Sequence, residues 1–305
     1  MIERSNTMKK ISIGSWAYCF GPYQNNPVPL DTVLEKVAAL GFDGISVGGF
    51  RPHAYYEDYP TLSDRKKLAQ KIKDCGLEVL CYTANIYQAN PLTELPEFMK
   101  YFGKTVQMMV DCGFKTVRID SIIPPIVPEG MSYEDCKTGI IEFLKRSSQA
   151  AAKEGIDLVW EFEPGFMLNK PSEVVEVYHR VAEKNFSLMF DTCHAHMCAV
   201  NGSRQLGEKE VLKGGILEFI EMVKDMIGIV HLIDSDNTLH DDETSTHAPF
   251  GQGVINFDEV IPALLHKANY TNDWWEIDLC FWPDAWNVTE QCKKFVDELN
   301  TKYCK

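Results

Sequence analysis

Short runs of Val, Ile, Leu and Phe recur along the chain, and each is followed by a stretch with helical periodicity. Runs of this length fit strands, whereas apolar residues that return every three to four positions fit one face of a helix. Eight runs are expected to form strands: Ile11–Ala17, Asp43–Val47, Leu77–Tyr82, Thr116–Ile119, Asp157–Phe162, Ser187–Asp191, Ile227–Ile233 and Trp274–Leu279.

The stretches between these runs predict helices. Two of them are expected to begin at capping side chains, one at Ser172 and one at Asp258. Several end at a glycine, as in Cys75-Gly76, where the chain needs a left-handed residue after the last helical turn. The other expected helices are Leu30–Leu40, Leu62–Cys75, Phe98–Cys112, Tyr133–Lys153, Leu212–Val223 and Asn287–Lys302.

Eight strand-then-helix units are the number that closes a (β/α)₈ barrel, and 305 residues fit one such domain. We therefore predict an α/β protein, a TIM barrel, with a single domain over residues 1–305 and a flexible N-terminus at residues 1–9. An open doubly wound sheet would alternate in the same way. However, the glycine-rich loop G-x-G-x-x-G that typically follows its first strand is missing from Gly14 onward.

The composition narrows the partners. The formal net charge is −14, from 44 acidic and 30 basic residues, which disfavours binding to a phosphate backbone. The ten cysteines contain no C-x-x-C pair, so reduced thiols are expected rather than a zinc knuckle or a disulfide scaffold. No stretch has the apolar length of a membrane helix. We expect a cytoplasmic protein with neither a nucleic-acid nor a membrane partner.

Acidic and histidine side chains gather where the last four predicted strands end, which is the active face of a barrel. These strands carry Glu161, Asp191, His231 and Glu276. Alone, His231 would more often be a hydrogen-bonded core histidine, and a single Glu would more often form a rim salt bridge. Together, three carboxylates and one imidazole suit a divalent cation that removes their mutual repulsion. We predict one metal ion, Mn²⁺ first, with Mg²⁺, Co²⁺ or Zn²⁺ as alternatives.

These stretches also resemble a known family. The strand ends Trp-Glu-Phe-Glu-Pro-Gly, Phe-Asp-Thr-Cys-His, Val-His-Leu-Ile-Asp and Trp-Glu-Ile-Asp are similar to those of the xylose-isomerase-like barrel superfamily of sugar isomerases and epimerases. The resemblance implies that Glu161 and Glu276 are both metal ligands and catalytic proton carriers. It also implies that Asp191 and His231 are ligands and that His194 binds a substrate oxygen.

Other side chains at the same rim are candidates for substrate binding. Trp16, and Phe281 with its neighbour Trp282, can stack on a sugar ring or simply pack. Arg118 either orients Glu161 or a substrate hydroxyl, or forms an internal ion pair. The polar stretch Asp234–His247 is expected to be a long loop over the active face. With His194, the substrate-binding candidates are Trp16, Arg118, Glu163, Asp234 and His247.

The chemistry of such a site narrows the function to a few classes. A cation bound to a carbonyl and a neighbouring hydroxyl stabilises the enediolate that forms when a base removes the adjacent proton. Return of the proton gives an epimer or an isomer, whereas loss of a β-substituent gives an elimination product. We therefore predict a metal-dependent isomerase or epimerase of a sugar, keto-sugar or cyclitol, in a homo-oligomer.

Three alternatives stay open. The first is a lyase of the same superfamily, similar to inosose dehydratases or to C-glycoside deglycosidases that act on 3-keto glycosides with a partner subunit. An abasic-site endonuclease is disfavoured by the net charge of −14. A barrel that only binds a sugar would leave three converging carboxylates without a purpose.

Overall fold

The computed structural model describes residues 8–304, in which eight parallel strands pair side by side in the order β1-β10-β7-β6-β5-β4-β3-β2. A parallel bridge between Gly14 and Ser46 joins the two ends of this sheet, so the barrel is nearly closed. The strands are β1 (Lys10–Ile13), β2 (Gly44–Gly48), β3 (Glu78–Thr83), β4 (Thr116–Ile119), β5 (Asp157–Glu161), β6 (Phe186–Asp191), β7 (Ile227–Leu232) and β10 (Trp274–Ile277).

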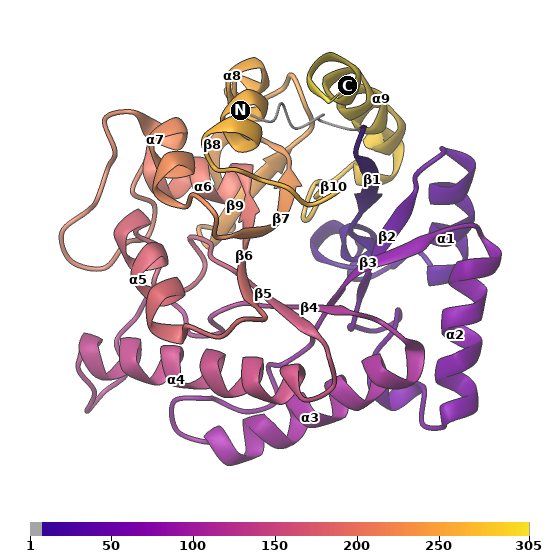
Figure 1. The fold of residues 1–305 in the computed structure, drawn as a ribbon, viewed down its shortest axis with the longest axis horizontal. Helices are drawn as coiled ribbons and strands as arrows, with labels where there is room; N and C mark the ends of the chain where they lie inside the picture. The colour runs from indigo at the N-terminus through magenta and orange to yellow at the C-terminus, as the bar shows by residue number, and fades with distance from the viewer. Residues whose placement is uncertain (1–7, 305) are drawn as a thin grey trace.

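Helices form an outer ring around the strands (Figure 1). Their apolar faces pack on the sheet, and the main hydrophobic cluster lies between the two layers. Among residues 8–304 no helix is both long and apolar enough to cross a membrane. The α-helices are α1 (Leu30–Ala39), α2 (Leu62–Asp74), α3 (Leu95–Cys112), α4 (Tyr133–Ala152), α5 (Pro171–Val181), α6 (Thr192–Ala199), α7 (Gly215–Met222), α8 (Phe257–His266) and α9 (Ala285–Tyr303).

This architecture confirms the predicted single-domain TIM barrel and rules out the open sheet. The glycine signals are also confirmed, since Gly41, Gly76, Gly113 and Gly155 all have φ between 65° and 78°. Most of the predicted flexible N-terminus, residues 1–7, lies outside the described residues. Lys9 is held, because its backbone N–H donates to Asn300 Oδ1 at 3.0 Å.

Both predicted helix caps were wrong. Helix α5 begins at Pro171, which suits the first position because it has no N–H to leave unpaired. Ser172 is therefore already inside the helix, where its hydroxyl bonds Glu210. Helix α8 is capped by Asn256, whose Oδ1 accepts the backbone N–H of Asp258 at 3.2 Å.

The first strand is shorter than predicted. It ends at Ile13, and Ser15–Tyr18 forms the 3₁₀ helix η1. The chain turns there because Ser15 Oγ accepts the backbone N–H of Gly48 at 2.8 Å, which ties this turn to β2. Two further 3₁₀ helices are η2 (Gly21–Tyr23) and η3 (Tyr56–Asp58).

The polar stretch after β7 forms regular secondary structure instead of the expected loop. It forms an antiparallel hairpin of β8 (Asp234–His240) and β9 (Thr244–Ala248), which pairs Ser235 with His247. The stretch after β6 was also missed as a helix: Asp191 caps α6 by accepting the backbone N–H of His194. Both elements bring their side chains toward the carboxyl ends of the strands.

Inside the barrel, an apolar layer lies below the polar ends of the strands. Because side chains alternate along a strand, the residue two positions later points to the same side. Glu161, Asp191 and His231 each stand two positions beyond a buried apolar residue of this inner layer. The layer consists of Leu80, Cys81, Val159, Met189 and Ile229.

Candidate active site

Four ionisable side chains converge above the inner layer. Glu161 ends β5, Asp191 ends β6, His231 lies in β7, and Asp278 follows β10. One ligand atom from each lies within 4.8 Å of the others. His231 Nδ1 is 2.9 Å from Glu161 Oε1, 3.5 Å from Asp278 Oδ2 and 3.7 Å from Asp191 Oδ2. All four are buried, so their charges interact strongly.

Each of the three carboxylates has one oxygen anchored by the protein. Such anchors fix the direction of the second oxygen, which in each case faces His231. The anchoring bonds run from Arg118 Nε to Glu161 Oε2 at 2.6 Å, from the His194 N–H to Asp191 Oδ1 at 2.8 Å, and from Trp16 Nε1 to Asp278 Oδ1 at 3.0 Å.

The inward-facing atoms fit a divalent cation. Glu161 Oε1 and His231 Nδ1 are 2.9 Å apart but are not aligned for a hydrogen bond. Together with Asp191 Oδ2 they are buried without a hydrogen-bonding partner among the described residues. Buried polar atoms normally have partners, so a converging group without them indicates an ion site. Three carboxylate oxygens and one imidazole nitrogen suit Mn²⁺, Mg²⁺, Co²⁺ or Zn²⁺.

The structure does not bring Glu276, the predicted fourth ligand, into this cluster. Glu276 is fully buried beneath His231, with its Oε2 3.1 Å from His231 Nε2, and Ser12 Oγ donates to its Oε1 at 3.2 Å. Asp278 lies two residues further along, on the same side and nearer the rim. A carboxylate on one imidazole nitrogen orients the other nitrogen toward a metal. Glu276 therefore positions His231, and Asp278 completes the cluster.

The protein balances the carboxylate charges with histidines. Burial opposes a charge on His231, but Glu161 and Glu276 hold its pKa well above the ordinary value. Burial also opposes a charge on His247, yet Asp191 and Asp278 raise its pKa to about 9. Burial raises the pKa of Asp191 to about 7, although both imidazoles oppose this. A bound divalent cation would supply the positive charge that these protonated imidazoles now provide.

A pocket of about 500 Å³ opens above the cluster. Glu161 and Asp278 reach its floor. A pocket of this size lies within the range of small-molecule sites. Five of the six substrate-binding candidates line it: Trp16, Arg118, Glu163, His194 and His247.

Polar contacts orient these lining side chains. Arg118 bonds both Glu161 and Asp120. Glu163 accepts a hydrogen bond from Thr244 of the hairpin, and burial raises its pKa to about 7. His194 shares a hydrogen bond with Ser245 at 3.0 Å. Burial and His247 lower the pKa of His194 to about 3, so its imidazole is neutral.

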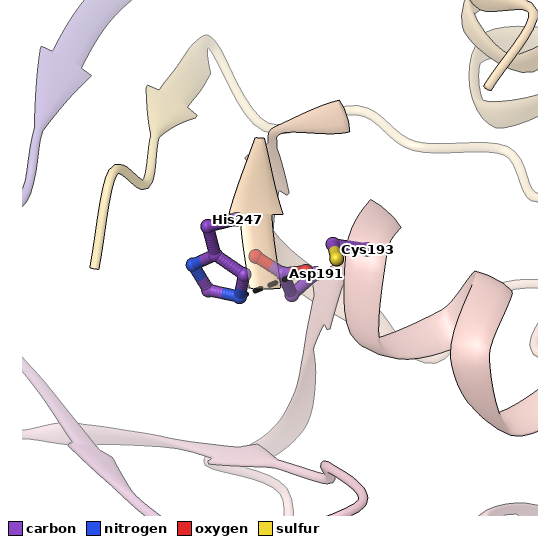
Figure 2. Close-up of side chains that lie close together, drawn as sticks. All are labelled: Asp191, Cys193 and His247. Atoms are coloured by element: carbon purple, nitrogen blue, oxygen red, sulfur yellow. Dashed lines mark ion pairs between the residues drawn. The ribbon is translucent and has the colours of Figure 1, made fainter. Parts of the chain in front are cut away.

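Figure 2 shows how the hairpin meets this wall. His247 reaches from β9 toward Asp191, with its Nε2 3.9 Å from Asp191 Oδ1, and Cys193 lies in the first turn of α6. The Cys193 thiol donates to the Thr246 carbonyl at 3.3 Å, and burial holds its pKa well above the ordinary value. Cys193, Asp191 and His247 form a second group of potential ligand atoms within 4.8 Å of one another, with the thiol bonded to the hairpin. All ten cysteines are free thiols in the structure.

Asp234, the remaining substrate-binding candidate, lies outside the pocket. Its carboxylate accepts backbone N–H groups at 2.9–3.1 Å and so ties the start of β8 to the turn before α8. The donors are Ser235, Gly251, Gly253 and Ile255. The prediction that Asp234 binds substrate is therefore not supported, and its role is structural.

Replacing Asp234 with Ala should lower the free energy of unfolding by about 3 kcal/mol, because buried N–H groups lose a charged acceptor. Urea unfolding followed by circular dichroism measures this. Asp74→Ala, an exposed position at the end of α2, is the control and should change stability by less than about 0.5 kcal/mol. Equal stability of the two variants would contradict the structural role.

Sequence reasoning missed several residues of the site. Asp278 could have been found, because it alternates with Glu276 on one strand and so shares its face. Tyr87, whose hydroxyl donates to Asp120 at 2.6 Å, and Phe166 line the pocket from loops. No periodic signal marks a loop position, so these two could not have been predicted.

The fold and the site define a (β/α)₈ barrel with a candidate metal centre. Three carboxylates and an imidazole form this centre at the carboxyl ends of the strands. Residues 34–294 match the xylose isomerase-like TIM barrel family, so the chain belongs to this family. Among curated proteins, none matches the chain.

Solved structures show the same fold at low identity. An IolI protein with a bound zinc atom is 19% identical, with a TM-score of 0.72, over 96% of this chain and 99% of its own. D-psicose 3-epimerase from Clostridium cellulolyticum H10, solved with D-tagatose, is 15% identical, with a TM-score of 0.70, over 97% and 99%. A probable 3-DHS dehydratase from Bacillus anthracis is 12% identical, with a TM-score of 0.68, over 94% and 98%.

Proposed function

We propose that this protein is a divalent-metal-dependent isomerase or epimerase of a sugar or keto-sugar. The observation that carries the proposal is the convergence of four ligand atoms within 4.8 Å of one another, two of them from Glu161 and Asp278, which line a 500 Å³ pocket. The resemblance in fold to a structure named as a D-psicose 3-epimerase supports the same class of reaction.

The residues that would hold the metal are Glu161, Asp191, His231 and Asp278. Mn²⁺ is favoured because most of the donors are carboxylate oxygens, and Zn²⁺ is the alternative. When bound, the cation would polarise the substrate carbonyl and stabilise the negative charge that develops beside it. Glu276 and Arg118 act through others: Glu276 orients His231, and Arg118 holds one oxygen of Glu161.

The protein supplies two carboxylates as proton carriers. Glu161 comes from β5 and Asp278 from the end of β10, and these strands flank the pair β6–β7. Both carboxylates line the pocket, and each keeps one oxygen free of anchoring bonds. We assign removal of the proton to one and its return to the other. Glu276, predicted for this task, is covered by His231 and does not line the pocket.

A lyase that uses the same site is the second candidate. Glu163 is a further pocket carboxyl outside the four ligands, with its Oε2 3.8 Å from His194 Nε2. A carboxyl group there can hand a proton to a departing oxygen after the neighbouring carbon has lost its proton. The structure named as a dehydratase makes elimination a reasonable branch for this fold.

The remaining predictions concern the binding partner, the oligomeric state and the cellular location of the enzyme. A small sugar is the expected partner, and a homo-oligomer in the cytoplasm is the expected form. An accessory subunit belongs only to the lyase alternative.

Exchange with D₂O tests the proposed reaction. We expect the manganese-loaded protein to catalyse deuterium uptake at the carbon beside the carbonyl of at least one keto-sugar, with signals of an isomer or epimer, measured by NMR. Removal of the metal by a chelator should slow this at least about a hundredfold. Appearance of an unsaturated product would instead establish the lyase. No uptake in a broad panel of keto-sugars would contradict both enzymes.

A further inference from the structure

Five aromatic side chains line the pocket in a continuous series, and we call them the aromatic arc. They come from the loops after five different strands, and each ring contacts the next. From Phe281 to Phe20 the ring centroids are 6.3 Å apart, from Phe20 to Phe50 4.6 Å, from Phe50 to Tyr87 6.3 Å, and from Tyr87 to Phe166 6.5 Å.

Burial separates the pocket into two zones. The polar floor is covered, since Glu161 and His247 are each only 2% exposed. The rings of the aromatic arc are half-buried, and Tyr87 is 47% exposed. Exposed apolar surface that rims a polar cavity typically marks a binding site.

One member of the aromatic arc has an unfavourable backbone conformation that its surroundings hold in place. Phe281 has a φ of 64°, the left-handed region that an aromatic residue rarely occupies. The His240 ring of the hairpin stacks on it, at 4.6 Å between centroids and 18° between planes. Strain of this kind persists where the surroundings fix it, and it is concentrated at functional sites.

The pocket offers no spare cation for a phosphate group. Among the described lining residues the charged basic side chains are Arg118, Arg51 and His247. His247 is engaged by Asp191 and Asp278, at 3.9 and 3.6 Å. Arg118 is engaged by Glu161 and Asp120, and Arg51 is engaged by Asp58. Phosphate is usually recognised by such side chains, so these ion pairs disfavour a phosphorylated sugar.

The volume also exceeds the needs of a free hexose. Even at the roughly 30 Å³ that a water molecule occupies in the liquid, the twelve non-hydrogen atoms of a hexose would fill only about 360 Å³ of the 500 Å³. All five rings of the aromatic arc line the same pocket.

We infer that the substrate is a neutral keto-glycoside, whose oxidised sugar ring places its carbonyl on the polar floor and whose aromatic aglycone contacts the aromatic arc. The inference rests on the proposed function, because it assigns the substrate class of the same site. Stacking between rings adds to the free energy that apolar burial supplies. A free sugar or a sugar phosphate would leave the aromatic arc in water.

Calorimetric titration of the manganese-loaded full chain tests this. The probes are the phenyl and methyl β-glycosides of glucose, galactose and xylose, with glucose 6-phosphate beside them. We expect at least one phenyl glycoside to bind at least tenfold more tightly than its methyl counterpart. In Phe20→Ala and Phe281→Ala this ratio should fall at least fivefold, and Phe20→Leu should retain more of it than Phe20→Ala.

Several results would overturn the inference. They are equal binding of phenyl and methyl glycosides, stronger binding of glucose 6-phosphate, or an unchanged ratio in all three variants. An unchanged ratio with a lower molar mass of Phe20→Ala by light scattering would assign the aromatic arc to a contact between copies of the chain. A phenyl preference without deuterium exchange on any keto-sugar would refute the enzyme instead, and exchange without the preference would refute only the glycoside.

Discussion

Replacing Glu161 with Gln is expected to lower kcat/KM for deuterium exchange by about a thousandfold or more while the barrel stays folded. The amide keeps the size of the side chain and removes the negative charge. The change takes away one of the four converging ligand groups and one of the two proposed proton carriers. Exchange rates by NMR, with circular dichroism for the fold, measure the effect.

Two further variants make this result specific. Glu142→Gln changes an exposed glutamate of α4 that pairs with Arg146, and it should keep activity within about twofold. Glu161→Asp keeps the charge on a shorter side chain and should retain more activity than Glu161→Gln. Wild-type exchange in Glu161→Gln would remove Glu161 from the mechanism.

Much of the barrel could be predicted from sequence because local periodicity determines its elements. The strand Thr116–Ile119 was predicted with its observed bounds, and the helix ends at Gly113 and Gly155 follow from one backbone conformation. Such signals need no knowledge of the rest of the chain.

The hairpin β8–β9 could not be predicted in this way. Its residues are mostly polar, so no apolar run marks either strand. Its strands are held by pairing across the hairpin, including a hydrogen bond of 2.8 Å between the hydroxyls of Thr238 and Thr246. Such contacts exist only once the two segments lie side by side.

Only part of the candidate site could be predicted, and the reason is related. Alternation along a strand tells which side chains share a face, but it does not tell their depth in the barrel. Glu276 and Asp278 both point inward, and only the folded structure shows that His231 lies between Glu276 and the other carboxylates. The aromatic arc depends on five loop conformations that no periodic signal encodes.

Replacement of the carboxylates of Asp278 and Glu276 gives the second large expected effect. Asp278→Asn should weaken metal binding about a thousandfold or more, because a negatively charged ligand becomes a neutral amide. Glu276→Gln should weaken it only about 10- to 100-fold, the usual effect of losing the group behind a metal-bound histidine. Titration with Co²⁺, followed by absorption spectroscopy and metal analysis, measures both variants.

The spectrum and the stoichiometry separate a ligand from its support. Glu276→Gln should still reach one Co²⁺ per chain at saturation with a spectrum like that of the wild type, because the four ligands are kept. Asp278→Glu, which restores a carboxylate, should bind more tightly than Asp278→Asn. The opposite pattern, with full cobalt and an unchanged spectrum in Asp278→Asn and no cobalt in Glu276→Gln, would return the ligand role to Glu276. His231 would then have to turn away from Glu276, because Glu276 Oε2 now lies 3.1 Å from Nε2, on the side opposite the three converging oxygens.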